Sequence, residues 1–350
     1  MSEWLVRYSE ADINHFTTSR ANETRFWQSI SFLDQSAPLA TALKDAAEFG
    51  IRYVLVGINE DIGPRANCGR GGATQGWQAF LKRFLNLPSN EFLDPKSVLL
   101  LGEVQCSDLQ SQSQKLDNSI ADDLTHLRNL CSELDERVTE VLKPIFDSGL
   151  EAIVIGGGHN NCYPILKALS TSEAKPCNAI NFDPHADFRA IEGRHSGNGF
   201  NYAYQDGYLN DYHVVGMHEQ KNNQTIISAL THAGFTYTTY QTLQVMRSRT
   251  LTSDCQHALA RFKTVNPLGI EVDVDAISGM PVSAFTNCGF SVSDAEHFVY
   301  LGATHSASKY LHLCEAAPET HPTGLQQGIT EAGQVLSGLV CSYLLGKQQA

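Results

Sequence analysis

Continuous runs of apolar residues recur along the chain, with enough residues between one run and the next to form a helix. Runs rich in Val, Ile and Leu are typical of strands that are buried on both faces of a parallel sheet. A further short strand is expected near residues 235–240, which brings the number to about eight. The other predicted strands lie at residues 53–57, 97–101, 152–155, 179–182, 212–216, 268–273 and 310–314.

Longer amphipathic stretches separate the apolar runs and predict helices for both faces of the sheet. Strands that alternate with helices imply a parallel sheet with right-handed crossovers, so we expect an α/β fold with three layers, αβα. A last helix is expected at 323–345, where Gln326 and Glu331 interrupt the apolar residues and argue against a membrane anchor. The other predicted helices include residues 122–147, 164–169, 222–232 and 291–308.

One large domain is expected to occupy residues 46–350, because no internal repeat or low-complexity linker divides this part of the chain. Residues 1–45 contain several aromatic side chains but no motif. We interpret them as an N-terminal extension that wraps the domain or mediates assembly.

The chain carries 25 Lys and Arg against 38 Asp and Glu, a formal net charge of −13. This balance repels phosphate backbones and anionic lipid, so neither nucleic acid nor a membrane is an expected partner. No apolar run reaches the ~18 residues of a membrane-spanning helix, and the N-terminus lacks a signal segment. Nine scattered cysteines without a Cys-x-x-Cys pair fit small core residues. We therefore expect a cytoplasmic protein.

Candidate metal ligands follow three of the predicted strands. Residues two apart in an extended segment share a face, so the Asp-x-His-x-Asp and Asp-x-Asp spacings each direct their side chains toward one point. Ligands of open parallel sheets bind outside the carboxyl ends of the strands, and all three motifs fall there. The motifs are Gly156-Gly157-Gly158-His159, Asp183-x-His185-x-Asp187 and Asp273-x-Asp275.

The donor set of four carboxylates and two imidazoles suits Mn²⁺ better than a thiolate-rich zinc site does, although cobalt, nickel or iron could occupy it. Carboxylates can bridge two ions, and ions ~3.5–4 Å apart can share a water that becomes hydroxide at neutral pH. Taken singly, each motif also fits aspartates that cap helices and a solvated histidine. Three motifs together, each after a strand, favour a two-metal hydrolase.

The three motifs resemble those of the ureohydrolase family, which includes arginase, agmatinase and formimidoylglutamase. The likeness covers roughly residues 50–345, from the loop at 59–67 to Glu315. It implies an arginase-like fold, two Mn²⁺ per subunit and assembly into homo-oligomers, trimers or hexamers. In the implied ligand sets, one ion is held by His159, Asp183, Asp187 and Asp273, and the other by His185, Asp183, Asp273 and Asp275.

Two residues favour the formimidoylglutamase branch of the family. Gly158 stands where arginases and agmatinases usually carry Asp before the first metal His, and Gly-Gly-Gly-His is more like the formimidoylglutamase pattern. Arg189, two residues after Asp187, also fits that subfamily. Its guanidinium would suit a substrate carboxylate, and the alternative is an ion pair with Glu192.

The loop after Arg194 is similar to the arginase loop that grips the amino-acid end of the substrate. Asn198 is predicted to contact the substrate, with a turn residue as the alternative. Arginases and agmatinases have a His in this loop, which neither Ser196 nor Phe200 provides. His195 is interpreted as an exposed turn residue, and the alternative is that it replaces this His if the loop shifts.

By the same resemblance, the chain is expected to hydrolyse N-formimidoyl-L-glutamate to L-glutamate and formamide, in histidine degradation, through a metal-bridging hydroxide. Asp275 would help to move the proton, Glu315 would orient the amidine group, and Arg189 and Asn198 would hold the carboxylates. The alternatives are a guanidino hydrolase that releases urea and a catalytically silent metal-binding homologue. In each enzymatic case the partner is a small molecule.

Overall fold

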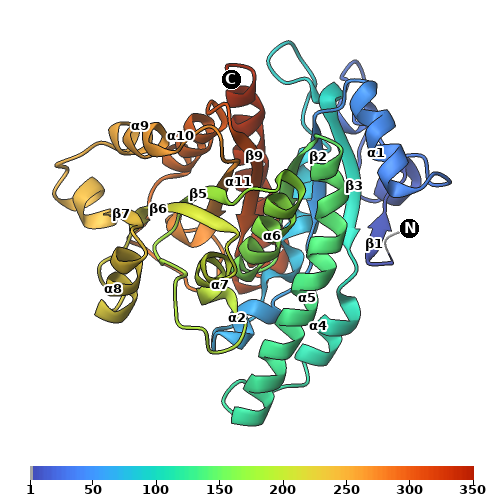
Figure 1. Ribbon diagram of the computed structural model, residues 1–350. Helices are drawn as coiled ribbons and strands as arrows, with labels where there is room; N and C mark the ends of the chain where they lie inside the picture. The colour runs from blue at the N-terminus through green and yellow to red at the C-terminus, as the bar shows by residue number, and fades with distance from the viewer. Residues whose placement is uncertain (1–2) are drawn as a thin grey trace.

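A nine-stranded sheet runs through the molecule, in a computed structural model that describes residues 3–350 (Figure 1). Eight strands are parallel, as the apolar runs predict, and the ninth, β1, is antiparallel at one edge. The strands are β1 (Leu5–Arg7), β2 (Tyr53–Gly57), β3 (Val98–Val104), β4 (Glu151–Ile155), β5 (Cys177–Phe182), β6 (Leu209–Met217), β7 (Thr236–Thr239), β8 (Leu268–Asp273) and β9 (Ser308–Cys314).

The order of the strands is β1-β3-β2-β4-β9-β8-β5-β6-β7. The strands that precede the three metal motifs, β4, β8 and β5, therefore lie at the centre, with only β9 between β4 and β8. Every residue of β5 and β8 is buried, which agrees with strands covered on both faces. The carboxyl ends of four central parallel strands thus meet at one edge of the sheet.

Helices cover both faces of the sheet and complete the three predicted layers. One face packs against α3 (Gly76–Phe84), α9 (Leu251–Arg261), α10 (Val292–Ala303) and α11 (Leu325–Lys347), in a core that includes Trp77, Phe298 and Leu336. The other face packs against α1 (Leu39–Glu48), α2 (Ile62–Ala66), α4 (Ser107–Ser113), α5 (Ala121–Asp147), α6 (Cys162–Glu173), α7 (Gly199–Gln205) and α8 (Gln224–His232).

The N-terminal residues contribute to the sheet and to its core. Leu5 pairs with Val104 and Arg7 with Gly102, which explains why β3 continues beyond its predicted end at residue 101. Phe26 is 1% exposed and packs in the same core as α3 and α11. The described part of the predicted extension therefore closes the edge of the main sheet, while residues 1 and 2 lie outside the described range.

Two further expectations concern membrane-spanning helices and the cysteines. Within residues 3–350, no helix combines the length and the apolar character that a membrane crossing requires. All nine cysteines are unpaired, and six of them are buried, as small core residues would be.

Candidate metal centre

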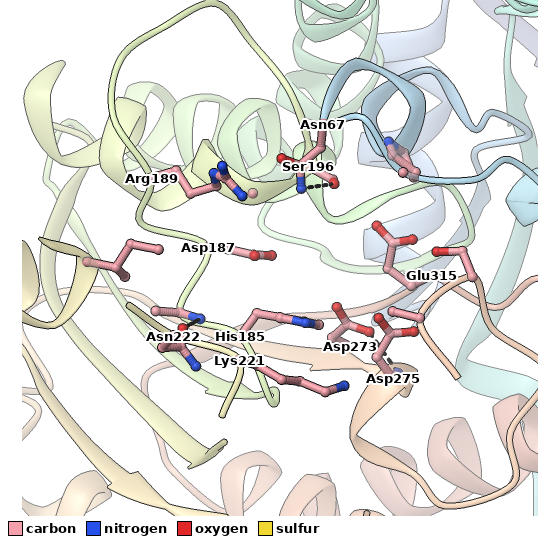
Figure 2. A pocket seen from close by; sticks show the side chains of 17 residues that line it. Asn67, His185, Asp187, Arg189, Ser196, Lys221, Asn222, Asp273, Asp275 and Glu315 are labelled. Carbon is pink, nitrogen blue, oxygen red and sulfur yellow. Dashed lines mark hydrogen bonds between the residues drawn. The ribbon is translucent and has the colours of Figure 1, made fainter. Parts of the chain in front are cut away.

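Four adjacent strands deliver the candidate ligands to one edge of the sheet. His159 follows β4 after a glycine turn, the Asp183–Asp187 segment follows β5, and Asp273 ends β8. Glu315 follows β9, which lies between β4 and β8. In Figure 2, Asp187, Asp273, Asp275 and Glu315 turn their carboxylates toward a common space. The predicted metal motifs are therefore brought together.

His159, Asp183, Asp187 and Asp273 form a first group, whose ligand atoms all lie within 4.8 Å of one another. Nδ1 of His159 is 2.8 Å from Asp187 Oδ2, 3.1 Å from Asp183 Oδ2 and 3.7 Å from Asp273 Oδ2. The imidazole is 1% exposed. Three carboxylates thus face a single nitrogen of an imidazole ring that is itself shielded from solvent.

A second group contains His185, Asp273 and Asp275, again with ligand atoms within 4.8 Å. Asp273 belongs to both groups. Asp183 also faces both imidazoles, because its Oδ2 lies 3.1 Å from His159 and its Oδ1 lies 3.4 Å from Nδ1 of His185. Two carboxylates are thus shared between two donor clusters.

The concentration of carboxylates in this buried site favours bound cations. Burial, reinforced by the neighbouring Asp183, raises the pKa of Asp273 to about 6. Burial and Asp273 also raise the pKa of Asp275 well above its ordinary value. Asp275 Oδ1 and both ring nitrogens of His159 are buried without a hydrogen-bond partner among the described residues. Orphaned oxygen and nitrogen donors around four carboxylates fit hard or borderline divalent ions such as Mn²⁺.

The glycine turn before His159 is held by a glutamate that sequence reasoning did not single out. Glu60 is fully buried, and its Oε1 accepts hydrogen bonds from Gly158 N and Asn161 Nδ2, each at 2.7 Å. Its Oε2 accepts from Ile62 N at 2.6 Å. Gly158 is required by close packing, because a Cβ there would lie 2.3 Å from Pro64 Cδ. An Asp at this position therefore has no room.

A cavity of about 150 Å³ opens onto the ligand groups and is lined by Arg189, Lys221 and Glu315. Glu315 Oε1 accepts a hydrogen bond from His159 N at 2.8 Å, while its buried Oε2 has no partner among residues 3–350. The Glu315 backbone is left-handed, with φ 64°. One oxygen of Glu315 thus links the segments that follow β9 and β4, and the other oxygen remains available to a ligand.

Two cations in the cavity lining have no anionic partner. The Arg189 guanidinium forms no ion pair or hydrogen bond within the described chain, and Glu192, its predicted alternative partner, contacts Arg128 and His195 instead. Lys221, which sequence reasoning missed, has a buried Nζ without a hydrogen-bond partner among residues 3–350. In Figure 2 its side chain extends toward Asp275.

Asn198 does not line the cavity. It is fully buried, its Oδ1 accepts from Arg194 Nη1 at 2.7 Å, and its Nδ2 donates to the carbonyl oxygens of Gly193 and Ala190 at 2.8 and 3.2 Å. Each donor and acceptor of the amide is therefore used within its own loop. The structure corrects the predicted role: Asn198 shapes the loop and does not reach the substrate space.

His195 also differs from its prediction as an exposed turn residue, because it is 0% exposed. Burial, together with the charges of Arg128 and Arg189, lowers the pKa of His195 to about 3. Its Nδ1 accepts a hydrogen bond from Gly197 N. A neutral imidazole that is enclosed in the loop is not placed to transfer protons in the cavity.

A buried ion pair holds this loop in place. Arg194 Nε lies 2.7 Å from Asp135 Oδ2 on α5, and its guanidinium also donates to the carbonyl oxygen of Asn160 at 2.8 Å. The neighbouring Ser196 and Gly197 reach the cavity. The cavity wall therefore depends on a contact between residues far apart in the sequence.

Comparisons with known proteins agree with this arrangement. Formimidoylglutamase of Geobacillus kaustophilus is 28% identical over 233 residues, 63% of this chain and 62% of that protein, so the chain spans less than two thirds of that relative. Formimidoylglutamase of Geobacillus thermodenitrificans is 27% identical over 302 residues, 84% of each chain.

The structures agree in fold. The crystal structure of Trypanosoma cruzi formiminoglutamase with Mn²⁺₂ has a TM-score of 0.69 at 18% identity, covering 93% of this chain and 98% of that chain. The model of the arginase family matches residues 51–329. With all three metal motifs gathered at the predicted edge of the sheet, this match shows that the chain belongs to the arginase family.

Proposed function

We propose that the protein is a binuclear manganese hydrolase that converts N-formimidoyl-L-glutamate and water to L-glutamate and formamide. The observation that carries this proposal is a buried cluster of shared carboxylates and imidazoles beneath a cavity that also holds two unpaired cations. The two Geobacillus relatives described above are formimidoylglutamases. Formimidoylglutamate has one amidine and two carboxylates, which matches both parts of this site.

The proposed ligands of the first ion are His159, Asp183, Asp187 and Asp273. For the second ion they are His185 and Asp275, with Asp183 and Asp273 shared between the two. Both shared carboxylates face donors of both clusters, which supports this assignment. Bound divalent ions supply a water of lowered pKa at neutral pH and stabilise negative charge that develops on the substrate.

Glu315 would bind the cationic amidine. Its Oε1 is fixed by the backbone N–H of His159, and its Oε2 is buried, unpartnered and at the cavity wall. An amidinium group offers N–H donors in a plane, so one would pair with this free oxygen. The amidine carbon would then lie next to the ligand cluster.

Asp275 would accept the proton of the attacking water, because its Oδ1 is buried beside the cavity without a partner. The water oxygen adds to the amidine carbon, and the bond between that carbon and the glutamate nitrogen breaks. The proton passes to the departing nitrogen, which leaves as the amino group of glutamate. Formamide retains the former amidine carbon and its terminal nitrogen.

Arg189 and Lys221 would bind the two carboxylates. They come from different loops, one after β5 and one after β6, and both line the cavity. An arginine can form paired hydrogen bonds with a carboxylate, whereas a lysine acts as a compact charge. Arginine carries one carboxylate and agmatine none, so either compound would leave at least one of these two cations, of which Lys221 has a buried Nζ, without an anionic partner. This disfavours both compounds as substrates.

The first experiment gives Mn²⁺-loaded protein formimidoylglutamate, arginine, agmatine and guanidinobutyrate in parallel and measures formamide and urea. Formamide from formimidoylglutamate alone is the expected result. Urea from a guanidino compound would replace the proposed substrate and retain two-metal hydrolysis. No turnover of any substrate, by protein with two ions bound, would identify the chain as a catalytically silent homologue.

Two further expectations stay predictions. Assembly into trimers or hexamers and a cytoplasmic location are carried by the family resemblance and by the sequence composition. The mass of the particle in solution, measured by light scattering, would check the first of them.

A further inference from the structure

A glutamate is fully buried within the central sheet, below the candidate metal centre. Glu271 lies on β8 two residues before Asp273, so both side chains leave the same face of the strand. Its exposed fraction is 0%, as are those of Tyr310 and His312 on the neighbouring β9. Burying an ionised carboxylate costs several kcal/mol of free energy unless close partners compensate for its lost hydration.

Strand β9 supplies two of these partners. The Tyr310 hydroxyl donates to Glu271 Oε1 at 2.6 Å, and Nδ1 of His312 lies 2.6 Å from Glu271 Oε2. The register pairs Glu271 with His312 and Gly269 with Tyr310. Gly269 leaves space for the tyrosine ring, because a Cβ there would lie 2.2 Å from the hydroxyl oxygen. The local sequences of both strands thus accommodate this one carboxylate.

The third partner of Glu271 is the first candidate ligand. Nε2 of His159 lies 3.5 Å from Glu271 Oε2, whereas Nδ1 of the same ring faces Asp183, Asp187 and Asp273. The imidazole therefore points one nitrogen at the ligand group and the other at the buried glutamate. Metal-binding histidines almost always donate their second ring N–H to a carboxylate, a carbonyl oxygen or water.

The next strand repeats the arrangement. Asn181 lies two residues before Asp183 on β5, and its Nδ2 donates to Asp183 Oδ2 at 3.0 Å. Its position pairs with Glu271 across the two strands. A layer of buried polar side chains thus lies one step below the ligands, on two neighbouring strands.

We propose that Glu271 is a positioning residue for the metal centre: its carboxylate, 3.5 Å from Nε2 of His159, favours a proton on that nitrogen and so selects the tautomer whose Nδ1 is free to bind an ion. Tyr310 and His312 hold the carboxylate in the orientation that this contact needs. This inference rests on the metal centre proposed above and adds to it a group that is not itself a ligand.

The test is a Mn²⁺ titration of metal-stripped Glu271→Gln protein. The affinity of each site is measured by calorimetry and by competition with a chelator. The Tyr310 hydroxyl needs an acceptor, so it will select the amide oxygen and turn the amide NH₂ toward His312 and His159. Two donors then face each other at His159 Nε2. We expect one of the two ions to bind about 10–100-fold more weakly, and the other to change less.

Asp254→Asn is the matched control. Asp254 is also a buried carboxylate, 1% exposed, and its Oδ2 lies 3.5 Å from Nε2 of His213. It lies on α9 and is absent from both candidate ligand groups. The control is expected to lose stability and to bind both Mn²⁺ ions with unchanged affinity, which separates a specific effect from general damage.

Tyr310→Phe keeps the carboxylate and removes one of its two hydrogen bonds, so it tests the proposal even if the glutamine variant does not fold. It should weaken the same ion by a smaller factor. Wild-type Mn²⁺ affinity in either folded variant would overturn the proposed role of Glu271. Failure of the wild-type protein to hydrolyse formimidoylglutamate with two ions bound would instead overturn the proposed function alone.

Discussion

Asp183 has the most demanding position of the candidate ligands, because each of its oxygens faces a different imidazole. Burial opposes its ionisation, but the nearby imidazoles of His159 and His185 outweigh that effect and lower its pKa. Its Oδ1 also accepts from His185 N at 2.6 Å, which fixes the turn after β5. One carboxylate therefore serves both donor clusters and the backbone that joins them.

Asp183→Ala is expected to remove both ions and all activity, because each cluster loses a shared ligand. The metal content of the purified variant, measured by elemental analysis, checks this outcome. Asp147→Ala is the control, since Asp147 is 41% exposed in a surface pair with Lys143 and should leave the content at two ions. A variant that retained both ions would refute the shared role of Asp183.

Arg189→Met and Lys221→Met are each expected to raise KM for formimidoylglutamate by about tenfold or more. Each change leaves one substrate carboxylate without its cation, which weakens substrate binding by at least ~1.4 kcal/mol. The Mn²⁺ content should not change. Steady-state kinetics provide the measurement, with Lys96→Met as control at a side chain that is 78% exposed. An unchanged KM in both variants would exclude a dicarboxylate clamp.

Local spacing predicts the ligands but misses several of the residues that support them. Two-residue spacing after a strand is a local property, so Asp183, His185 and Asp187 could be identified from the chain alone. Lys221 reaches the cavity only because of the path that the chain takes after β6. Glu271 reads as part of an apolar run, and only the register with β9 reveals its partners.

At the scale of elements, a loop that looks exposed in sequence is anchored inside the molecule. The segment 194–198 contains glycine and polar residues, which favour a surface turn. The Arg194–Asp135 ion pair draws it against α5, and that partner lies in a helix whose sequence reads only as amphipathic. The eight parallel strands were predictable from their apolar runs, whereas the edge strand β1 and this long-range pair were not. The positions of Asn198 and His195 were mispredicted because the ion pair was missed.

Arg194→Met is expected to lower the free energy of unfolding by about 3–5 kcal/mol, because it leaves the Asp135 carboxylate buried without a partner. The double change with Asp135→Leu should recover a large part of this loss, since an apolar pair no longer contains an uncompensated charge. Urea denaturation measures both values. A double variant that is less stable than Arg194→Met would contradict this account.

At the scale of the whole molecule, the metal centre concentrates negative charge where the sheet has its four central strands. Bound cations would offset that charge, so their removal should weaken the fold as well as the chemistry. A chelator is expected to lower Tm by several degrees, and Mn²⁺ should restore it. Differential scanning fluorimetry of metal-stripped and reloaded protein measures this change. An unchanged Tm would argue against a coupling between metal binding and the stability of the fold.

The difference in Tm between metal-loaded and metal-stripped protein should depend on pH. The pKa of Asp273 is raised to about 6 in the metal-free fold, so protonation stabilises that fold as pH falls through 6 toward the lower pKa of the unfolded chain. Metal binding needs the deprotonated form. The gap in Tm between loaded and stripped protein is therefore expected to narrow from pH 7 to pH 5, and a widening gap would contradict the sign.

The distances in sequence between the ligands also bear on how the protein acquires its metal during synthesis. The first candidate ligand is His159 and the last is Asp275, so the donor set is incomplete until the ribosome has released the chain beyond β8. Short nascent segments would offer only part of it, and a flexible partial set favours whichever ion binds most strongly, usually copper or zinc. The donors meet only where β4, β8 and β5 lie close together in the sheet, so the folded pocket, and not the emerging chain, presents the complete set to an ion.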